Sequence, residues 1–296
     1  MFSKKLLIPL LSLSLLVTPA YSSHAAENAE AAGTSVEGQG MLSPSSSSES
    51  SESVFNGSGA GTSSEPVTDE KLETILKQVQ SQLPTENGTE GSLNDQKMQA
   101  ASLIKLYIMG AVYENYDQIT GQYGRDSVDS NLYSMITVSD NDAANTLTTY
   151  LGGGDSAAGM QAVNSFCQAH GYDQTHMGRM LLASNENDDN YTSVGDCGHL
   201  LQEIYKQDTS GYTHATDMFN LLKAQTRCNK IPAQLPEGVK TANKTGELDN
   251  VENDAGIIYD SKNDVVIVFM SQNLSSAGSA QNTIATLSRT IYDYYN

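Results

Sequence analysis

The chain is 296 residues long, enough for one large domain or two small ones. It carries 16 Lys and Arg against 35 Asp and Glu, a formal charge of -19. This excess of negative charge repels a phosphate backbone, so we expect no nucleic-acid partner. The three cysteines show no C-x-x-C or Cys/His spacing, and they are too few for a disulfide framework. We therefore expect no structural metal.

The first 25 residues have the pattern of a secretory signal peptide. Lys4 and Lys5 precede an apolar run over residues 6–17, and small residues follow, ending in Ser23-His24-Ala25. The alternative is an uncleaved membrane anchor, but about 12 apolar residues are too few for a bilayer that needs about 20. We expect cleavage of residues 1–25, a secreted extracellular protein and no stable membrane span.

Residues 26–66 are rich in Ser, Gly and Glu and contain almost nothing that could be buried. Such a composition predicts a disordered, flexible linker. It also explains why the apolar content of the whole chain is slightly below the globular range. The remaining residues, 67–296, carry most of the negative charge and are expected to form one folded domain.

Apolar residues at helical spacing dominate the first part of this domain. They predict a first helix between Pro66 and Pro84, where the second proline ends it. Further helical stripes are centred on residues 104–112, 132–136, 163–167, 200–204 and 218–222.

Strand signals come late in the chain. Residues 255–259 and 265–270 are apolar or β-branched runs joined by the turn-like residues 260–263, which predicts a hairpin. A last helix is expected over residues 280–294. This order predicts an α+β fold, with a small antiparallel sheet covered by the two terminal helices beside an all-helical lobe.

Several kinds of catalytic or metal site are disfavoured. The chain has no G-x-S-x-G or H-E-x-x-H motif, which argues against a Ser-His-Asp hydrolase and a zinc protease. His170 precedes Gly171 and is interpreted as a helix-end residue. The acidic run 187–190 lacks the glycine and the distal glutamate of a calcium loop, so we interpret it as a solvated loop.

Ser102 and Lys105 open the helix predicted around residues 104–112. Residues three apart on a helix lie on one face, so the amine can reach the hydroxyl. A lysine can activate a serine as a nucleophile if burial or nearby cations lower its pKa. Alone, the pair is equally typical of a helix-start serine beside a surface lysine.

Two further segments strengthen the case. Ser139-Asp140-Asn141 lies between two predicted helices, on a turn that could point side chains into a cleft or could simply cap a helix. Lys244-Thr245-Gly246 precedes the predicted hairpin, and its glycine would let a substrate backbone approach closely, although an ordinary strand start is also possible. The three segments together, in this order, indicate an active site.

The ordered motifs S-x-x-K, S-D-N and K-T-G resemble those of the penicillin-recognising serine hydrolases, in particular the class A β-lactamase-like family. The likeness extends to residues 135–145, 230–236 and 253–255, and covers the chain from about Lys71 onward. It implies a β-lactamase/transpeptidase-like fold and an enzyme that works through an acyl-enzyme without a cofactor.

By this resemblance, Ser102 is the acylated nucleophile and Lys105 its base. Ser139 relays a proton to the leaving nitrogen, Lys244 maintains the local field, Asn141 binds the amide side chain of the substrate, and Thr245 binds its carboxylate. The backbone N–H groups of Ser102 and Glu247 are implied to form the oxyanion hole.

The chain departs from the family pattern at the Ω loop. Class A β-lactamases carry there a glutamate that directs water onto the acyl-enzyme, and the matching segment 179–185 has Leu181 at that position. Glu186 is close in sequence but lies five residues further along a loop, which is not equivalent geometry. We therefore expect slow or impaired deacylation.

Two other departures concern the sheet and the substrate site. Few residues separate Pro84 from Ser102, so we expect reduced N-terminal strands, a stub near residues 91–93, and the strand at 265–270 near an open edge. Glu247 follows the K-T-G motif and places a carboxylate beside Thr245, which should weaken anionic substrates unless its side chain points away.

Three functions fit these observations. The first is an exported serine hydrolase acylated by a β-lactam or a related amide, with a small-molecule substrate. The second is a D-alanyl-D-alanine peptidase-like enzyme acting on cell-wall peptides. The third is a non-catalytic module that binds penicillins or wall fragments. Cys167, Cys197 and Cys228 have no assigned role, and buried free thiols are expected.

Overall fold

The computed structural model describes residues 10–19, 89–93 and 95–296. These residues belong to one compact unit. The predicted helix between Pro66 and Pro84 and the predicted linker 26–66 lie outside the described residues.

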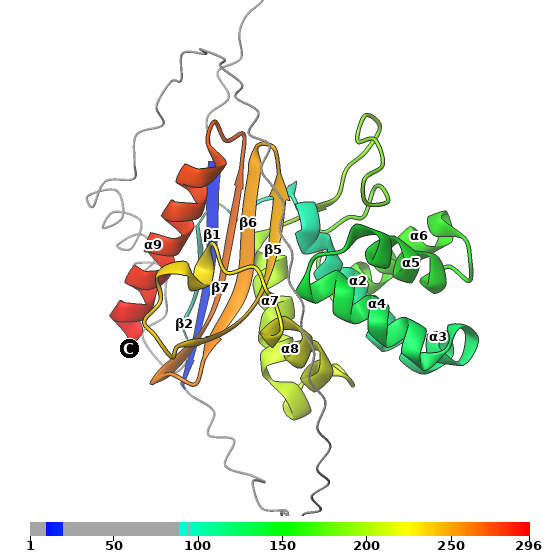
Figure 1. Cartoon of the computed structure of the whole chain (residues 1–296), viewed down its shortest axis with the longest axis horizontal. Helices are drawn as coiled ribbons and strands as arrows, with labels where there is room; N and C mark the ends of the chain where they lie inside the picture. The colour runs from blue at the N-terminus through cyan, green and yellow to red at the C-terminus, as the bar shows by residue number, and fades with distance from the viewer. Residues whose placement is uncertain (1–9, 20–88, 94) are drawn as a thin grey trace, which may run out of the picture. The chain divides into compact units, whose positions relative to one another are not determined.

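The centre of this unit is a five-stranded antiparallel sheet with the order β2-β1-β7-β6-β5 (Figure 1). Its strands are β1 Leu10–Pro19, β2 Thr89–Leu93, β5 Lys240–Leu248, β6 Val251–Tyr259 and β7 Asn263–Gln272. The predicted hairpin is therefore confirmed as β6 and β7, and the K-T-G motif lies within the edge strand β5.

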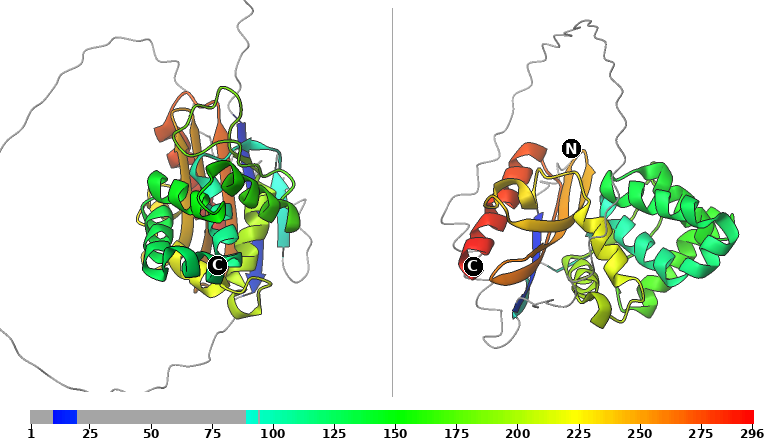
Figure 2. Two further views of the ribbon diagram at one scale, coloured as in Figure 1. Left: turned by 90° about the vertical axis from the view of Figure 1, so that its right-hand side faces the viewer. Right: turned by 60° about the horizontal axis from the view of Figure 1, so that its bottom comes forward.

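Both faces of β7 are buried, which explains why its sequence is almost continuously apolar. Val265, Ile267 and Phe269 belong to a small core with the C-terminal helix α9, Ala277–Tyr295. Residues 266, 268 and 270 point the other way, into the main core shared with the helical lobe. Figure 2 shows α9 on one side of the sheet and the helices of the lobe on the opposite side.

The expectation of an open edge at β7 is wrong. Strand β1 pairs with β7 over its whole length, from Leu10 opposite Gln272 to Pro19 opposite Asn263. The expected stub is the five-residue strand β2, which pairs with the other side of β1. Residues predicted to be the apolar part of a signal peptide thus form a strand, and a short apolar run is compatible with either structure.

The helical lobe contains all five predicted helical stripes. Its helices are α2 Ile104–Glu114, α3 Tyr116–Tyr123, α4 Arg125–Thr137, α5 Asn141–Leu151, α6 Ser156–Ala169, α7 Val194–Tyr205 and α8 Ala215–Lys223. The short elements are β3 Met98–Gln99, β4 Tyr191–Thr192, and the 3₁₀ turns η1 Ala101–Leu103, η2 Gln207–Thr209 and η3 Ile231–Gln234.

Helix α2 is the centre of the lobe, because every residue from Ile104 to Tyr113 is buried. Helix α7 contacts β7, β1 and β6 and joins the lobe to the sheet. Within the described part of the chain, no helix combines the length and the hydropathy needed to span a membrane. The α+β architecture predicted from the sequence is confirmed.

Candidate active site

Ser102 and Lys105 meet at the start of α2. The backbone enters this region through Ala101, whose φ of 47° lies in the left-handed region that non-glycine residues rarely adopt. The 3₁₀ turn η1 then continues into α2, and Lys105 Nζ lies 3.1 Å from Ser102 Oγ. Lys105 is fully buried, whereas Ser102 is half-buried. The serine is therefore accessible and the lysine is shielded from water.

The turn between α4 and α5 contributes the second group of side chains. Ser139 has a φ of 62°, and Asp140 caps α5 by accepting a hydrogen bond from the Ala143 N–H at 2.8 Å. Lys105 Nζ donates to Ser139 Oγ at 3.1 Å, to the Ser139 carbonyl at 2.6 Å and to Asn141 Oδ1 at 2.7 Å. The strained turn thus directs two polar side chains onto the buried amine.

Strand β5 supplies a second lysine from the other side. Lys244 is fully buried, and its Nζ donates to Ser139 Oγ at 2.8 Å and to the Thr245 carbonyl at 2.8 Å. The Ser139 hydroxyl therefore touches both Lys105 and Lys244. A chain of contacts runs from Ser102 through Lys105 and Ser139 to Lys244.

Gly246 allows β5 to pass unusually close to the Ser102 turn. A Cβ at this position would lie 2.9 Å from the Ala100 carbonyl oxygen and 3.2 Å from the Ser102 nitrogen. A side chain would therefore push the strand away. The close approach occurs one residue before Glu247, whose N–H is expected from the sequence to form an oxyanion hole together with that of Ser102.

The two lysines have perturbed proton affinities. Burial lowers the pKa of Lys105 to about 8, with Asp140 opposing the shift and Arg227 adding to it. Burial, followed by the charges of Lys105 and Arg227, holds the pKa of Lys244 well below its usual value. Lys105 Nζ lies beside four oxygens, whereas a charged lysine has only three N–H donors. A neutral amine has a lone pair in place of one donor, so it can accept a proton from one of the two neighbouring hydroxyls.

The side chain of Glu247 is held by cations. It accepts hydrogen bonds from Arg227 Nη1 at 2.6 Å and from Lys230 Nζ at 2.7 Å. Lys230 is fully buried and also pairs with Glu252 at 2.7 Å. Sequence reasoning missed Arg227 and Glu252 as members of this site. They lie on different elements, and no motif spacing links them.

The segment expected to match the Ω loop lies against α5. The side chain of Asn145 is hydrogen-bonded to the backbone N–H and carbonyl of Leu181, and the Leu181 side chain is buried. Glu186 is exposed, and its N–H donates to Ser184 Oγ. The position facing Asn145 thus carries an apolar side chain.

The interpretation of residues 187–190 as a solvated loop is wrong for two of them. Asp189 and Asn190 are 4% and 2% exposed. Asp189 pairs with Arg179 at 2.7 Å and accepts from Gln99 Nε2 at 2.9 Å, while Asn190 Oδ1 accepts from two loop N–H groups. These polar side chains are buried because they anchor the loop.

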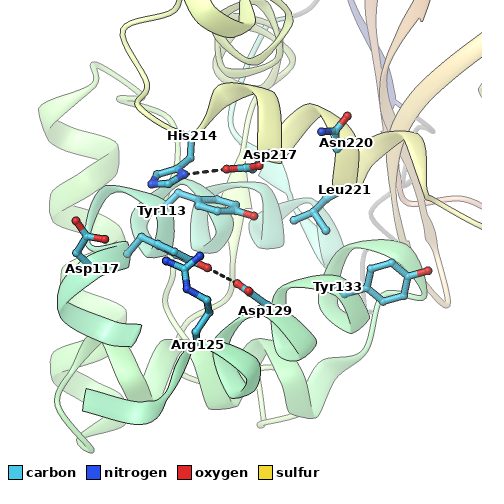
Figure 3. A pocket seen from close by; sticks show the side chains of 10 residues that line it. Tyr113, Asp117, Arg125, Asp129, Tyr133, His214, Asp217, Asn220 and Leu221 are labelled. Carbon is cyan, nitrogen blue, oxygen red and sulfur yellow. Dashed lines mark hydrogen bonds and ion pairs between the residues drawn. The ribbon is translucent and has the colours of Figure 1, made fainter. Parts of the chain in front are cut away.

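A separate cavity of about 400 Å³ lies in the helical lobe (Figure 3). Its wall includes the ring cluster of Tyr113, Tyr116 and His214. Two of its three acidic side chains have partners, because Tyr116 donates to Asp129 at 2.5 Å and His214 lies 2.8 Å from Asp217. None of the side chains around Ser102 lines this cavity.

The three cysteines and His170 were the other residues considered from the sequence. Cys167 and Cys197 are buried free thiols on α6 and α7, as expected, whereas Cys228 is exposed. His170 is the C-cap of α6 and precedes Gly171, which confirms its interpretation as a helix-end residue. In residues 10–19, 89–93 and 95–296, no group of His, Cys, Asp and Glu side chains could hold a metal ion.

Solved structures with the same fold include β-lactamases and a penicillin-binding protein. A β-lactamase from Sphaerobacter thermophilus is 20% identical, with a TM-score of 0.61 over 76% of this chain and 96% of that chain. An ancestral class A β-lactamase is 19% identical, with a TM-score of 0.62 over 75% and 99%.

A third structure is an acyl-enzyme complex of PBP-A with penicillin G, in a leucine-to-glutamate mutant. It is 21% identical, with a TM-score of 0.63 over 76% of this chain and 95% of that chain. At these identities the structures establish the fold.

Sequence comparison establishes the family. Among curated proteins, no sequence matches this chain. A family model described as "Beta-lactamase enzyme family" matches residues 122–295, more than half of the chain. The chain therefore belongs to the β-lactamase enzyme family.

Proposed function

We propose that this protein is an exported active-site serine hydrolase, acylated on Ser102 by a β-lactam or a related amide. The observation that carries the proposal is the contact between Ser102 Oγ and Lys105 Nζ at 3.1 Å, with the lysine buried and its pKa lowered to about 8. A lysine with that pKa is partly neutral near pH 7, so it can serve as a general base.

In the acylation step, neutral Lys105 takes the hydroxyl proton of Ser102. The Oγ atom then forms a bond to the substrate carbonyl carbon, and the carbonyl oxygen becomes an oxyanion held by the N–H groups of Ser102 and Glu247. The C–N bond breaks as Ser139 gives its proton to the leaving nitrogen. Lys105 then passes the proton that it took from Ser102 to Ser139 Oγ, 3.1 Å away, which restores the Ser139 hydroxyl and the neutral amine, while Lys244 maintains the local field.

The same geometry supports roles for the substrate-binding residues. Asn141 lies beside Lys105 and has an amide that can bond to the acylamino side chain of a substrate. Thr245 lies on the same face of β5 as Glu247 and is 1% exposed. We propose that its hydroxyl binds a polar group attached near the leaving nitrogen. Neither role needs a cofactor.

Deacylation is proposed to be slow. Hydrolysis of an acyl-enzyme needs a base that activates water. Leu181 has no acid or base, and its backbone is fixed by Asn145. The acyl-enzyme would therefore accumulate.

The same leucine favours a second candidate, a D-alanyl-D-alanine peptidase-like enzyme of the cell wall. In that reaction Ser102 attacks the peptide carbonyl and D-alanine leaves. If the acyl group then passes to an amine acceptor, the acyl-enzyme bond breaks without an activated water, whereas release of the acyl group as a free acid still needs one. Release of D-alanine from a muropeptide would distinguish this candidate from a β-lactamase.

Export rests on the pattern of residues 1–25. The same segment contains strand β1, so cleavage would remove a strand that pairs with β7. N-terminal sequencing of the protein secreted by cells that express the full chain tests the proposal, which expects a new N-terminus near residue 26.

The catalytic proposal is tested with a fluorescent penicillin. We expect covalent labelling of the wild-type chain and none of Ser102→Ala. A Ser102→Ala protein that still binds penicillin with unchanged affinity, together with a wild-type chain that is never labelled, would instead identify a non-catalytic binding module.

A further inference from the structure

Glu247 lies in a cross-strand cluster of carboxylates at the β5 edge of the active site. It stands directly opposite Glu252 on β6, and Thr245 stands opposite Asp254. Alternate residues of a strand share a face, so these four side chains lie on one face of the strand pair. Like charges placed directly opposite each other are destabilising, so a cation is needed between the two glutamates.

Lys230 is that cation. Its Nζ lies 2.7 Å from a carboxylate oxygen of Glu247 and 2.7 Å from one of Glu252, and the lysine is fully buried. Arg227 adds a second ion pair to Glu247 at 2.6 Å, and Gln281 donates to the other oxygen of Glu252 at 2.9 Å. The two cations of this face are therefore matched by two glutamates.

The third carboxylate of the cluster is Asp254, and it contributes to the negative charge of this face. It is buried and accepts hydrogen bonds from Asn243 Nδ2 and the Ile231 N–H. Burial raises the pKa of Asp254 to about 6, although Lys230 opposes the shift. At neutral pH this face of the sheet edge carries at least as much negative as positive charge.

Glu247 is the member of the cluster that can meet a substrate. Its side chain is 29% exposed, whereas those of Lys230 and Glu252 are 0% and 4% exposed. It follows Thr245 by two residues on the same strand face. A substrate group bound at Thr245 therefore lies beside a carboxylate whose two cations are already engaged.

We propose that Glu247 is a specificity-determining residue that selects substrates whose group at Thr245 is neutral or cationic and disfavours a free carboxylate. The inference rests on the proposed function, since it assigns the substrate class of the same site. A carboxylate placed there would meet the like charge of Glu247, because the two cations that contact Glu247, Arg227 and Lys230, are already paired with carboxylates.

The test compares benzylpenicillin with its methyl ester, in which the carboxylate has lost its charge and gained a methyl group. The measured quantity is the ratio of the two acylation rate constants, acid over ester. In Glu247→Gln we expect this ratio to rise at least tenfold, because the opposing charge is removed. Glu247→Asp keeps the charge and should keep the ratio within about threefold of the wild type.

Arg227→Gln provides a variant with the opposite expected effect. Arg227 is largely exposed, and its loss leaves the charge of Glu247 less neutralised. The acid-over-ester ratio should then fall at least threefold. An unchanged ratio in Glu247→Gln, or a rise in Arg227→Gln, would overturn the proposal. A fall in both variants would also overturn it, since the ion pair would then position Arg227 to receive the carboxylate.

The outcome can be separated from failure of the proposed function. If no chain is acylated by either compound, calorimetric binding of acid and ester to Ser102→Ala, alone and combined with Glu247→Gln, gives the same ratio as an affinity. A tenfold rise supports the role of Glu247 even then, and an unchanged affinity ratio overturns it.

Discussion

Asn145 and Leu181 are joined by two hydrogen bonds between a side chain and a backbone. Asn145 Nδ2 donates to the Leu181 carbonyl at 3.0 Å, and the Leu181 N–H donates to Asn145 Oδ1 at 2.8 Å. Asn145 is one helical turn beyond Asn141, which contacts Lys105. The backbone of Leu181 is therefore fixed within one turn of the active-site cluster.

Replacing Leu181 by glutamate should create the missing base. Because Asn145 holds only the backbone, the substitution leaves the anchoring hydrogen bonds intact. A positioned general base contributes about 10²- to 10⁴-fold, so we expect Leu181→Glu to speed release of the penicilloyl group at least tenfold. Leu181→Gln, of the same shape without a base, should not. Equal release rates in the two variants would contradict the role assigned to this position.

Acylation should depend on pH through Lys105. The buried lysine has a pKa of about 8, and only its neutral form accepts the Ser102 proton. Below that pH the neutral fraction falls about tenfold per pH unit, so the second-order acylation rate should rise from pH 6 to 8 and level off above. Stopped-flow labelling across this range measures it. A rate that does not change from pH 6 to 9 would exclude Lys105 as the base.

Removing the Ser139 hydroxyl should impair acylation. In Ser139→Ala neither lysine keeps its contact with that oxygen, and the leaving nitrogen loses its proton donor. We expect acylation by benzylpenicillin to slow by about 10²-fold, within the range for lost proton transfer. Ser134→Ala, on the preceding helix α4, is the control and should acylate at the wild-type rate. A wild-type rate in Ser139→Ala would remove Ser139 from the mechanism.

The ion pair between Arg179 and Asp189 should matter for stability. Its side chains are only 13% and 5% exposed, and breaking a buried pair leaves an uncompensated charge. We expect Asp189→Ala to lower the free energy of unfolding by about 3 kcal/mol in urea titrations. The matched control is Asp188→Ala, which loses an exposed pair with His176 and should cost under about 1 kcal/mol. Equal costs would contradict the anchoring role of Asp189.

Strand β1 should protect β7. A chain that begins at residue 26 lacks β1, which leaves the ten-residue edge of β7 unpaired. An unpaired apolar strand is a template for association. We expect the shortened chain to self-associate in sedimentation experiments and its residues 265–270 to exchange amide hydrogens faster than those of the full chain. If the two chains behave alike, β1 contributes nothing to the folded sheet.

The motifs predicted much of the fold and the close approach of the site residues. Helical periodicity located α4, α6, α7 and α8, because each buries one face against the same core. The apolar sequence of α2 predicted a helix as well, and that helix is buried on all sides. Helix α3 was missed, since only Tyr116 and Ile119 among its eight residues are buried and no stripe develops.

Other features depend on contacts between distant segments and left no local signal. The pairing of β1 with β7 joins residues more than two hundred positions apart, and its apolar sequence suits a signal peptide equally well. The charge balance around Glu247 depends on a loop arginine, a buried lysine and a glutamate on the neighbouring strand. Spacing along the chain cannot predict such a cluster.

Acylation of Ser102 is measured most directly by peptide mapping with mass spectrometry after exposure to benzylpenicillin. Opening of the β-lactam ring expels no atoms, so we expect the peptide containing Ser102 to gain the whole mass of the antibiotic and to retain it over time. We expect no such gain in Ser102→Ala. A covalent adduct on another residue, or penicillin turned over equally fast by Ser102→Ala, would show that Ser102 is not the nucleophile.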